Sequence, residues 1–149
     1  MQIRLGDSVM VSDPCYSVGT WCQQIIEDVL EGDYIITPYM AELDGWGNRV
    51  VELVVIHKKY KTHADELISG DIGVDSGICG VYDLNYFVES KNVDSEKFFA
   101  KACDVANPVG TQDYSGVATR SGCGDGMYAC YVGRRKDGKI VSIRLSFAE

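Results

Sequence analysis

Residues 73–83 read GVDSGICGVYD, an Asp-Ser-Gly sequence set between glycines and followed by apolar residues and a second aspartate. The glycines permit a positive φ or a close approach of the backbone, and Asp75 and Ser76 can form hydrogen bonds with local amides. The stretch therefore predicts a strand–turn–strand element whose aspartates line or brace a site.

Two β-hairpins are predicted on either side of this element. YIITPYMAEL (34–43) and RVVELVVI (49–56) are apolar runs separated by a short segment that contains Asp-Gly. MYACYVGRR (127–135) and KIVSIRLSF (139–147) are likewise joined through Asp-Gly. Such turns are typical of antiparallel pairs. Pro38 cannot donate a hydrogen bond to a ladder, so its strand is expected at an edge or a bulge.

Two helices are also predicted. Trp21, Ile25 and Val29 are spaced four apart, with polar residues between them, which indicates an amphipathic helix that stops at Gly32. Asp94–Val105 gives the second helix, with Asp94 as its N-cap. The expected fold class is therefore α+β, one domain over residues 1–149, with a mainly antiparallel twisted sheet of seven to nine strands and two helices.

A short internal echo suggests duplication. VSDPCY (11–16) matches VYDLNY (81–86) at its Val, Asp and Tyr positions, and each copy is followed by an expected helix and then by strands. A pseudo-duplicated α+β unit would explain this pattern.

Charge and composition exclude several classes of function. The formal charge of the 149 residues is -8, so direct binding of nucleic acid or of an anionic membrane is not expected. No signal sequence or apolar run of membrane-spanning length is evident, which predicts a cytoplasmic protein, in the host cell if the chain is phage-encoded. In a reducing compartment the six cysteines are expected to be free thiols.

One candidate chemistry is hydrolysis by paired aspartates. Asp75-Ser76-Gly77 matches the Asp-Ser/Thr-Gly signature of aspartic peptidases, which need two carboxyl groups that share a proton. Asp13 or Asp125, or a second copy of the chain, would have to supply the other. Because no complete catalytic set is evident, an aspartate-dependent hydrolase using Asp75 is kept as the alternative to a binding protein.

Neither a metal nor a cofactor is predicted. Cys15 and Cys22, like Cys123 and Cys130, are separated by six residues, which does not fit a zinc knuckle, and no stretch matches a calcium loop. The carboxylate of Asp13 beside Cys15 is expected to raise the pKa of this thiol rather than activate it.

An anionic ligand is a further possibility. Ser121–Gly126 (SGCGDG) is flexible enough to wrap a phosphate with backbone amides, and Arg120 and Arg134 lie close to it in the sequence. This pattern predicts a place for a small nucleotide-like molecule.

Three motifs together resemble a known group of proteins. DPCY (13–16), VDSGICGVYD (74–83) and GDGMYACYVG (124–133), followed by Asp-Gly and a further strand, are similar in order and spacing to an uncharacterised family of small bacterial and phage proteins. Many members of that family carry Gln where Ile78 stands here. The family has no established activity, so the resemblance implies a lineage and a cellular setting. It also favours a single site formed by the aspartates and glycines of these motifs.

The expected function is that of a non-enzymatic binding or inhibitor protein. Its partner would be a host protein engaged through the acidic surface, as for a phage or bacterial counter-defence protein, or a small anionic ligand; a homo-oligomer is possible. The predicted ligand-binding residues are Asp13, Asp75, Ser76, Gly77, Asp83, Asp125, Gly126, Arg120 and Arg134.

Overall fold

The computed structural model describes residues 1–148, which form eleven strands and one helix. The elements are β1 (Gln2–Leu5), β2 (Val9–Ser12), β3 (Gln24–Ile26), β4 (Gly32–Leu43), β5 (Gly47–His57), β6 (Glu66–Val74), β7 (Ile78–Asp83), α1 (Leu84–Val105), β8 (Val109–Gln112), β9 (Gly116–Arg120), β10 (Gly126–Arg134) and β11 (Ile140–Ser146).

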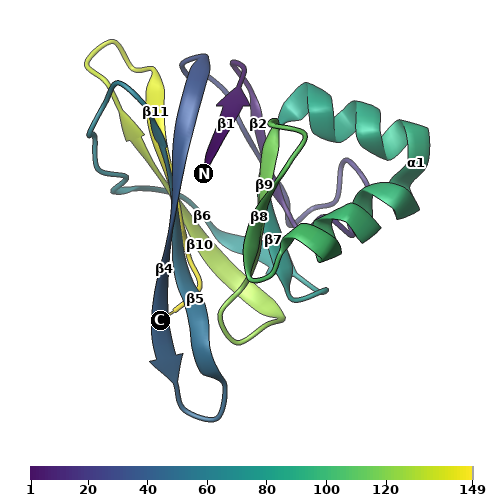
Figure 1. The fold of residues 1–149 in the computed structure, drawn as a ribbon. Helices are drawn as coiled ribbons and strands as arrows, with labels where there is room; N and C mark the ends of the chain where they lie inside the picture. Colours follow the sequence, from purple (N-terminus) through teal and green to yellow (C-terminus); the bar gives the residue numbers. More distant parts are fainter. Residues whose placement is uncertain (149) are drawn as a thin grey trace.

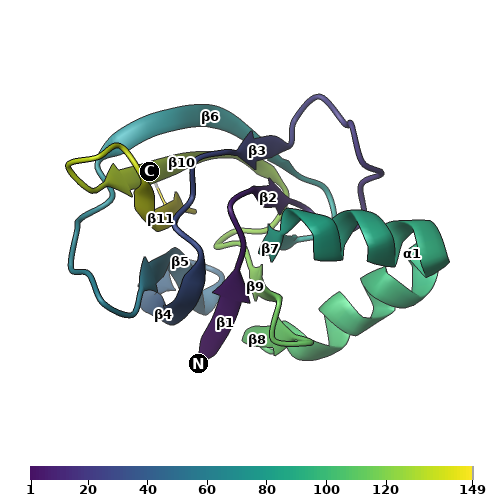
Figure 2. The same cartoon turned by 90° about the horizontal axis from the view of Figure 1, so that it is seen from above.

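The strands form two antiparallel sheets, and the helix adds a third layer (Figure 1). The larger sheet has the order β1-β4-β5-β11-β10-β6, and the smaller has the order β3-β2-β7-β9-β8. The smaller sheet lies between the larger sheet and α1 (Figure 2). The segment 73–83 runs from the end of β6 in the larger sheet into β7 in the smaller one, so it carries the chain between the two layers.

Residues of β7 alternate between the two cores, as side chains on a strand must. Cys79 and Val81 are buried in the core between the sheets. Tyr82 faces the other way and packs with Phe87 and Phe98 of α1. Ile78, on the same side as Tyr82, packs against small side chains of α1 and β9. The apolar residue at position 78 is therefore part of the contact between sheet and helix.

Both predicted hairpins are confirmed. β4 pairs with β5 and β10 pairs with β11, each in antiparallel register. Pro38 lies on β4 beyond the part that pairs with β1, so one side of the strand is open there, and a register shift follows between Tyr39 and Met40. The proline thus occupies the kind of position that its missing N–H requires.

The predicted pair of helices is wrong, and so is the single sheet. The segment 21–30 contains β3, whose Ile26 pairs with Val9 of β2. Trp21 is 79% exposed whereas Val29 is buried, so residues spaced four apart do not share a face. Asp28 has φ 60, which also interrupts a helix. Pairing with β2 outweighs the local helical periodicity.

The other predicted helix is confirmed as the second half of α1. Asp94 has non-helical φ and ψ and divides the helix at a kink, and its Oδ1 accepts a hydrogen bond from the backbone N–H of Lys97 at 3.0 Å. The first half, Leu84–Val93, was not predicted. It begins after Asp83, whose side chain accepts from the N–H of Tyr86.

The sequence echo does not correspond to a repeated unit. Only the second copy is followed by a helix; the first leads into an irregular loop. The two copies instead lie side by side and antiparallel, with Val11 of β2 opposite Val81 of β7.

Candidate functional site

Asp13 is the centre of a buried hydrogen-bond network that links two motifs. Its side chain is fully buried at the end of β2. Oδ2 accepts from the backbone N–H groups of Asp75 and Ser76, at 2.8 and 2.7 Å. Oδ1 accepts from the Ser76 hydroxyl and from the N–H of Cys15, both at 2.8 Å. Four donors fill the acceptor capacity of this carboxylate, so Asp13 braces the turn before β7.

The turn that Asp13 braces has the geometry that its glycine predicts. Gly77 has φ 73, in the left-handed region that favours glycine. Its carbonyl accepts from the N–H of Ser121 at 3.2 Å, which ties the turn to the loop before β10. Asp13, Ser76 and Gly77 therefore form structural support beneath a surface to which Asp75 contributes its side chain.

The loop of residues 13–23, here called the Asp13 loop, projects beside β3 and α1 (Figure 2). Gln23 holds it from within, because its Oε1 accepts from the N–H groups of Gly19 and Thr20 and its Nε2 donates to the Ser12 hydroxyl. Lys91 of α1 holds it from outside by donating to the Pro14 carbonyl. These contacts hold the loop in place without a helix.

A cavity of about 580 Å³ opens between the Asp13 loop and the adjoining ends of β6 and β10. We call it the Trp21 cavity. It is lined by Tyr16, Thr20, Trp21, Cys22, Gly73, Val74, Asp75, Asp125, Gly126 and Met127. Gly126 and Val74 are paired neighbours on β10 and β6, so the cavity spans the end of that ladder. Three predicted site residues, Asp75, Asp125 and Gly126, thus come together here.

Gly73 allows the wall of this cavity to close. Its N–H donates to the Cys22 carbonyl at 3.1 Å. A Cβ at position 73 would lie 2.6 Å from Sγ of Cys22, closer than real side chains approach. The glycine is therefore needed for the Asp13 loop to pack against β6.

The rim of the Trp21 cavity combines an exposed indole with two carboxylates. Trp21 is 79% exposed and Met127 is 42% exposed. Asp75 and Asp125 are also exposed, and within residues 1–148 neither side chain has a hydrogen-bond or ion-pair partner. Unpaired charge beside exposed apolar surface suits recognition better than it suits stability.

The protonation of the groups near this cavity follows from their surroundings. Burial, together with the hydrogen bond and charge of Asp13, raises the pKa of Cys15 to about 12. This confirms the expected direction of the shift. Burial and a hydrogen bond with Cys22 raise the pKa of Tyr16 as well. Both groups are neutral at physiological pH, so Cys15 is a poor nucleophile.

Asp83 lies at the opposite end of β7 from Ser76. Its Oδ1 accepts from the N–H of Gly6 at 2.9 Å, and its Oδ2 caps α1. It lines a different cavity, with Arg4 and Glu31. The structure therefore separates Asp83 from the other predicted aspartates.

The two predicted arginines are also apart. Arg120 ends β9, and its Nε donates to the Ala106 carbonyl at 3.0 Å. Arg134 ends β10, at the other end of the strand from Gly126, where its guanidinium binds both carboxylate oxygens of Glu66. They do not converge on one anion site.

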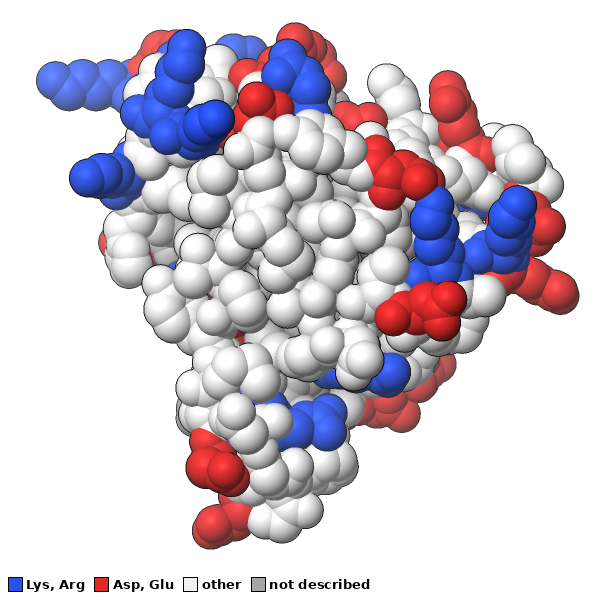
Figure 3. Space-filling model, viewed as in Figure 1, with Lys and Arg blue, Asp and Glu red and all other residues white. Residues whose placement is uncertain are grey.

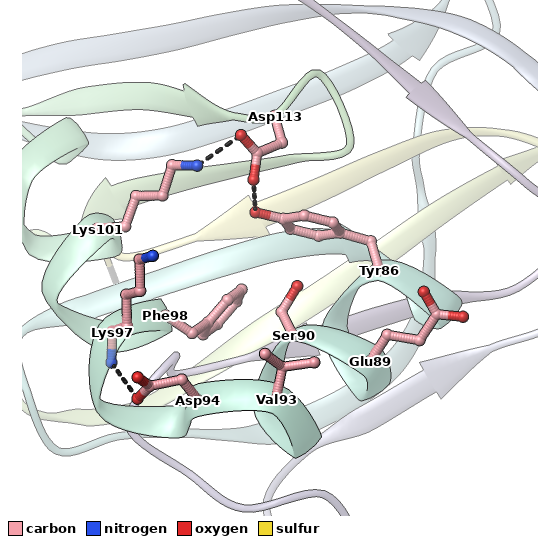
Figure 4. Close-up of a pocket in the computed structure, with 9 residues that line it drawn as sticks. All are labelled: Tyr86, Glu89, Ser90, Val93, Asp94, Lys97, Phe98, Lys101 and Asp113. Atoms are coloured by element: carbon pink, nitrogen blue, oxygen red, sulfur yellow. Dashed lines mark hydrogen bonds and ion pairs between the residues drawn. The ribbon is translucent and has the colours of Figure 1, made fainter.

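A second cavity, of about 380 Å³, lies in the angle between the two halves of α1 (Figure 4). Asp113 accepts from both Lys101 and the Tyr86 hydroxyl there, at 2.5 and 2.8 Å. Lys97, Glu89 and Asp94 add further charges of both signs to the lining. Because its charges are mixed and partly paired, this cavity is less suited to a charged ligand than the Trp21 cavity is.

Charge on the face seen in Figure 3 is likewise mixed. Acidic and basic side chains lie around its margin and an uncharged area occupies its centre. This face offers no continuous acidic surface.

Several classes of site are not seen in residues 1–148. No group of three or more His, Cys, Asp or Glu side chains is arranged to hold a metal ion. All six cysteines are free, in agreement with the expectation. No helix in this part of the chain is long and apolar enough to cross a membrane.

Some residues of the cavity were missed from the sequence. The spacing of Trp21 predicts the core face of a helix, and the sequence gives Tyr16 and Met127 no role beyond their motifs. A signal for Trp21 existed in its polar neighbours, Thr20, Gln23 and Gln24, which are atypical of a buried stripe.

Comparison with known proteins identifies the family. No curated protein and no solved structure matches the chain. A family model described as "Protein of unknown function (DUF4241)" matches residues 5–145. This range includes the Asp13 loop, the residues that line the Trp21 cavity and the cavity at α1, and the ten strands β2–β11 except the last residue of β11. The chain therefore belongs to the DUF4241 family.

Proposed function

We propose that this protein is a non-enzymatic binding protein whose site is the Trp21 cavity. One observation carries the proposal: Trp21, Asp75 and Asp125 are all exposed and line one cavity, and within residues 1–148 neither carboxylate has a partner. Most ligand sites combine apolar surface with a few polar groups in a concave setting of 300–1,000 Å³, roughly, and this cavity fits that range.

The geometry supports binding more than catalysis. The carboxylate oxygens of Asp13 accept hydrogen bonds from four donors, and the Ser76 hydroxyl donates to Asp13. Neither side chain is therefore free to activate water or attack a substrate. The ring of His57 is held by the N–H of Lys59. An aspartate-dependent hydrolase would need Asp75 to act with Asp125, and no hydrogen bond joins these two carboxyl groups in the described chain.

The rigid support of the rim favours a site that is formed before its ligand arrives. The backbone at Asp75 is held by Asp13, and the Asp13 loop is held by Gln23 and Lys91. A rim that is already ordered loses less conformational entropy on binding.

The test is a thermal-shift screen of the wild-type protein and the Trp21→Ala variant. The panel is tetralysine amide, tetraglutamate amide, spermine and ATP. We expect at least one compound to raise the Tm of the wild type and not that of Trp21→Ala. Because Trp21 is exposed, its removal leaves the fold intact. If no compound distinguishes the two proteins, the proposal is wrong. If the wild type cleaves a peptide and the Asp75→Asn variant does not, the protein is a hydrolase.

The identity of the partner as a host protein, and a phage or bacterial counter-defence role, remain predictions from the sequence resemblance. They are compatible with a binding site of this kind. An inhibitor role would follow if the bound segment of the partner were one that the partner needs for its own activity.

A further inference from the structure

We infer that the Trp21 cavity takes a lysine or arginine side chain from a basic segment of a partner protein. The inference rests on the proposed function of this cavity and specifies the chemistry of its guest. It is carried by the complementarity between an organic cation and three features of the lining: two carboxylates, an aromatic face and a thioether.

The carboxylates provide the charge. Asp75 projects from the turn before β7 and Asp125 from the loop before β10, so the two approach the cavity from different segments. Within residues 1–148 no lysine or arginine pairs with either of them. Some other surface carboxylates are paired, such as Glu66 with Arg134 and Asp137 with Arg135. A guest cation would therefore supply a charge partner that the chain itself does not.

The apolar residues provide a place for the rest of the side chain. An ammonium or guanidinium group over an indole ring within about 6 Å gains cation–π attraction. The aliphatic stem of lysine or arginine can then pack against Met127 and the ring of Trp21. The same chemistry occurs within this chain, where Arg144 lies 4.0 Å from the centroid of the Tyr131 ring.

The size of the cavity favours a segment of polypeptide over an isolated cation. About 580 Å³ is more space than one ammonium group fills, and the opening lies at the end of the β6–β10 ladder, where Gly126 leaves the backbone exposed. The net charge of -8 attracts basic segments over longer range.

The experiment is calorimetric titration with tetralysine amide. We expect binding that weakens at least tenfold in the Asp75→Asn/Asp125→Asn double variant, and also in Trp21→Ala. The matched control is Glu42→Gln/Asp44→Asn, which removes the same charge at the tip of the exposed β4–β5 hairpin. We expect this control to bind within twofold of the wild type. Tetra(acetyl-lysine) amide, which lacks the charge, should not bind.

Each other outcome overturns the inference in a different way. Equal weakening in both double variants would mean general attraction to an acidic protein. Binding of spermine without tetralysine would assign the cavity to a free polyamine. If tetraglutamate or ATP binds at Trp21 instead, the proposed function survives and the basic guest is wrong; if nothing binds, both fail.

Discussion

At each end of the β2–β7 pair, an aspartate side chain accepts hydrogen bonds from backbone N–H groups, but the two aspartates stabilise different structures. At one end, Asp13 follows β2 and accepts from the backbone just before β7. At the other end, Asp83 closes β7 and accepts from Gly6, just before β2. At the C-terminal end of each strand, an aspartate thus accepts hydrogen bonds from the backbone that leads into the other strand. Val11 and Val81 are paired between the two aspartates.

What differs is the chain that follows each aspartate. Asp83 leads directly into α1 and caps it, so its side chain is shared between a turn and a helix. Asp13 precedes Pro14 and a loop, so all of its hydrogen bonds serve the loop and the turn. An Asp at the same place in a pair of strands thus caps a helix or braces a turn, according to the chain that follows it.

The largest effect is expected from removing these two carboxylates in turn. Asp13→Ala leaves three backbone N–H groups and one hydroxyl without their acceptor, and we expect the free energy of unfolding to fall by about 3–5 kcal/mol. Asp83→Ala removes a helix cap and one turn contact, with an expected loss of about 1–2 kcal/mol. Urea denaturation measures both.

Asp44→Ala, at an exposed turn, is the control and should change stability little. If Asp13→Ala does not fold, Asp13→Asn gives the comparison, because its amide keeps one acceptor oxygen. Equal losses at positions 13 and 83 would break the distinction between the two ends.

A glycine substitution tests how tightly the Asp13 loop packs. Gly73→Ala would force Cys22 to move, and we expect a loss of about 1–3 kcal/mol. Gly70→Ala, on the same strand, meets open space and should be neutral or slightly stabilising. Thermal denaturation of both variants is the measurement, and a loss at position 70 as large as at 73 would contradict the packing argument.

Ser76→Ala isolates one bond at the Asp13 end. The hydroxyl donates to Asp13 at 2.8 Å, so its removal should cost about 1 kcal/mol while the backbone contacts remain. Urea denaturation can resolve this difference. A loss as large as that of Asp13→Ala would show that the hydroxyl, rather than the backbone N–H groups, carries the network.

The smallest effect concerns the reactivity of Cys15. A thiol of pKa 9.0 is half ionised at pH 9, whereas one of pKa about 12 is ionised to roughly one part in a thousand. Alkylation of Cys15 by iodoacetamide should therefore be slow at pH 9 and rise toward pH 12. Asp75→Asn removes one of the charges that raise this pKa, so we expect a rate increase of a few fold, followed by mass spectrometry.

The control for this measurement is Asp44→Asn, which lowers the net negative charge equally without approaching Cys15. A rate in the wild type equal to that of an ordinary thiol would contradict the assigned environment of Cys15.

The sequence predicts those parts of the fold whose determinants are local. The hairpins β4–β5 and β10–β11 follow from apolar runs on either side of Asp-Gly turns, and the second half of α1 follows from its cap at Asp94. The segment 21–30 does not form the expected helix, because spacing by four also occurs by chance in a loop and a short strand. Its structure is decided by pairing with β2.

The candidate site is predictable only in part, for the same reason. The motifs identify Asp75, Asp125 and Gly126, and these do share a cavity. The hydrogen bonds of Asp13 to Ser76 and of Asp83 to Gly6 span 63 and 77 residues, which no local pattern encodes. The motifs therefore predict one group of aspartates, whereas the strands place Asp83 and Asp13 at opposite ends of a pair.

The place of β11 in the larger sheet has a consequence for biosynthesis. This strand lies between β5 and β10, although it is the last of the described strands to be translated. Until residues 140–146 leave the ribosome, the β1-β4-β5 and β10-β6 parts of the sheet have no common neighbour and each presents an open edge. Contacts of such long sequence separation form slowly. The nascent chain thus completes this sheet only after residues 140–146 have been made, and chaperones would meet it before then with those edges still unpaired.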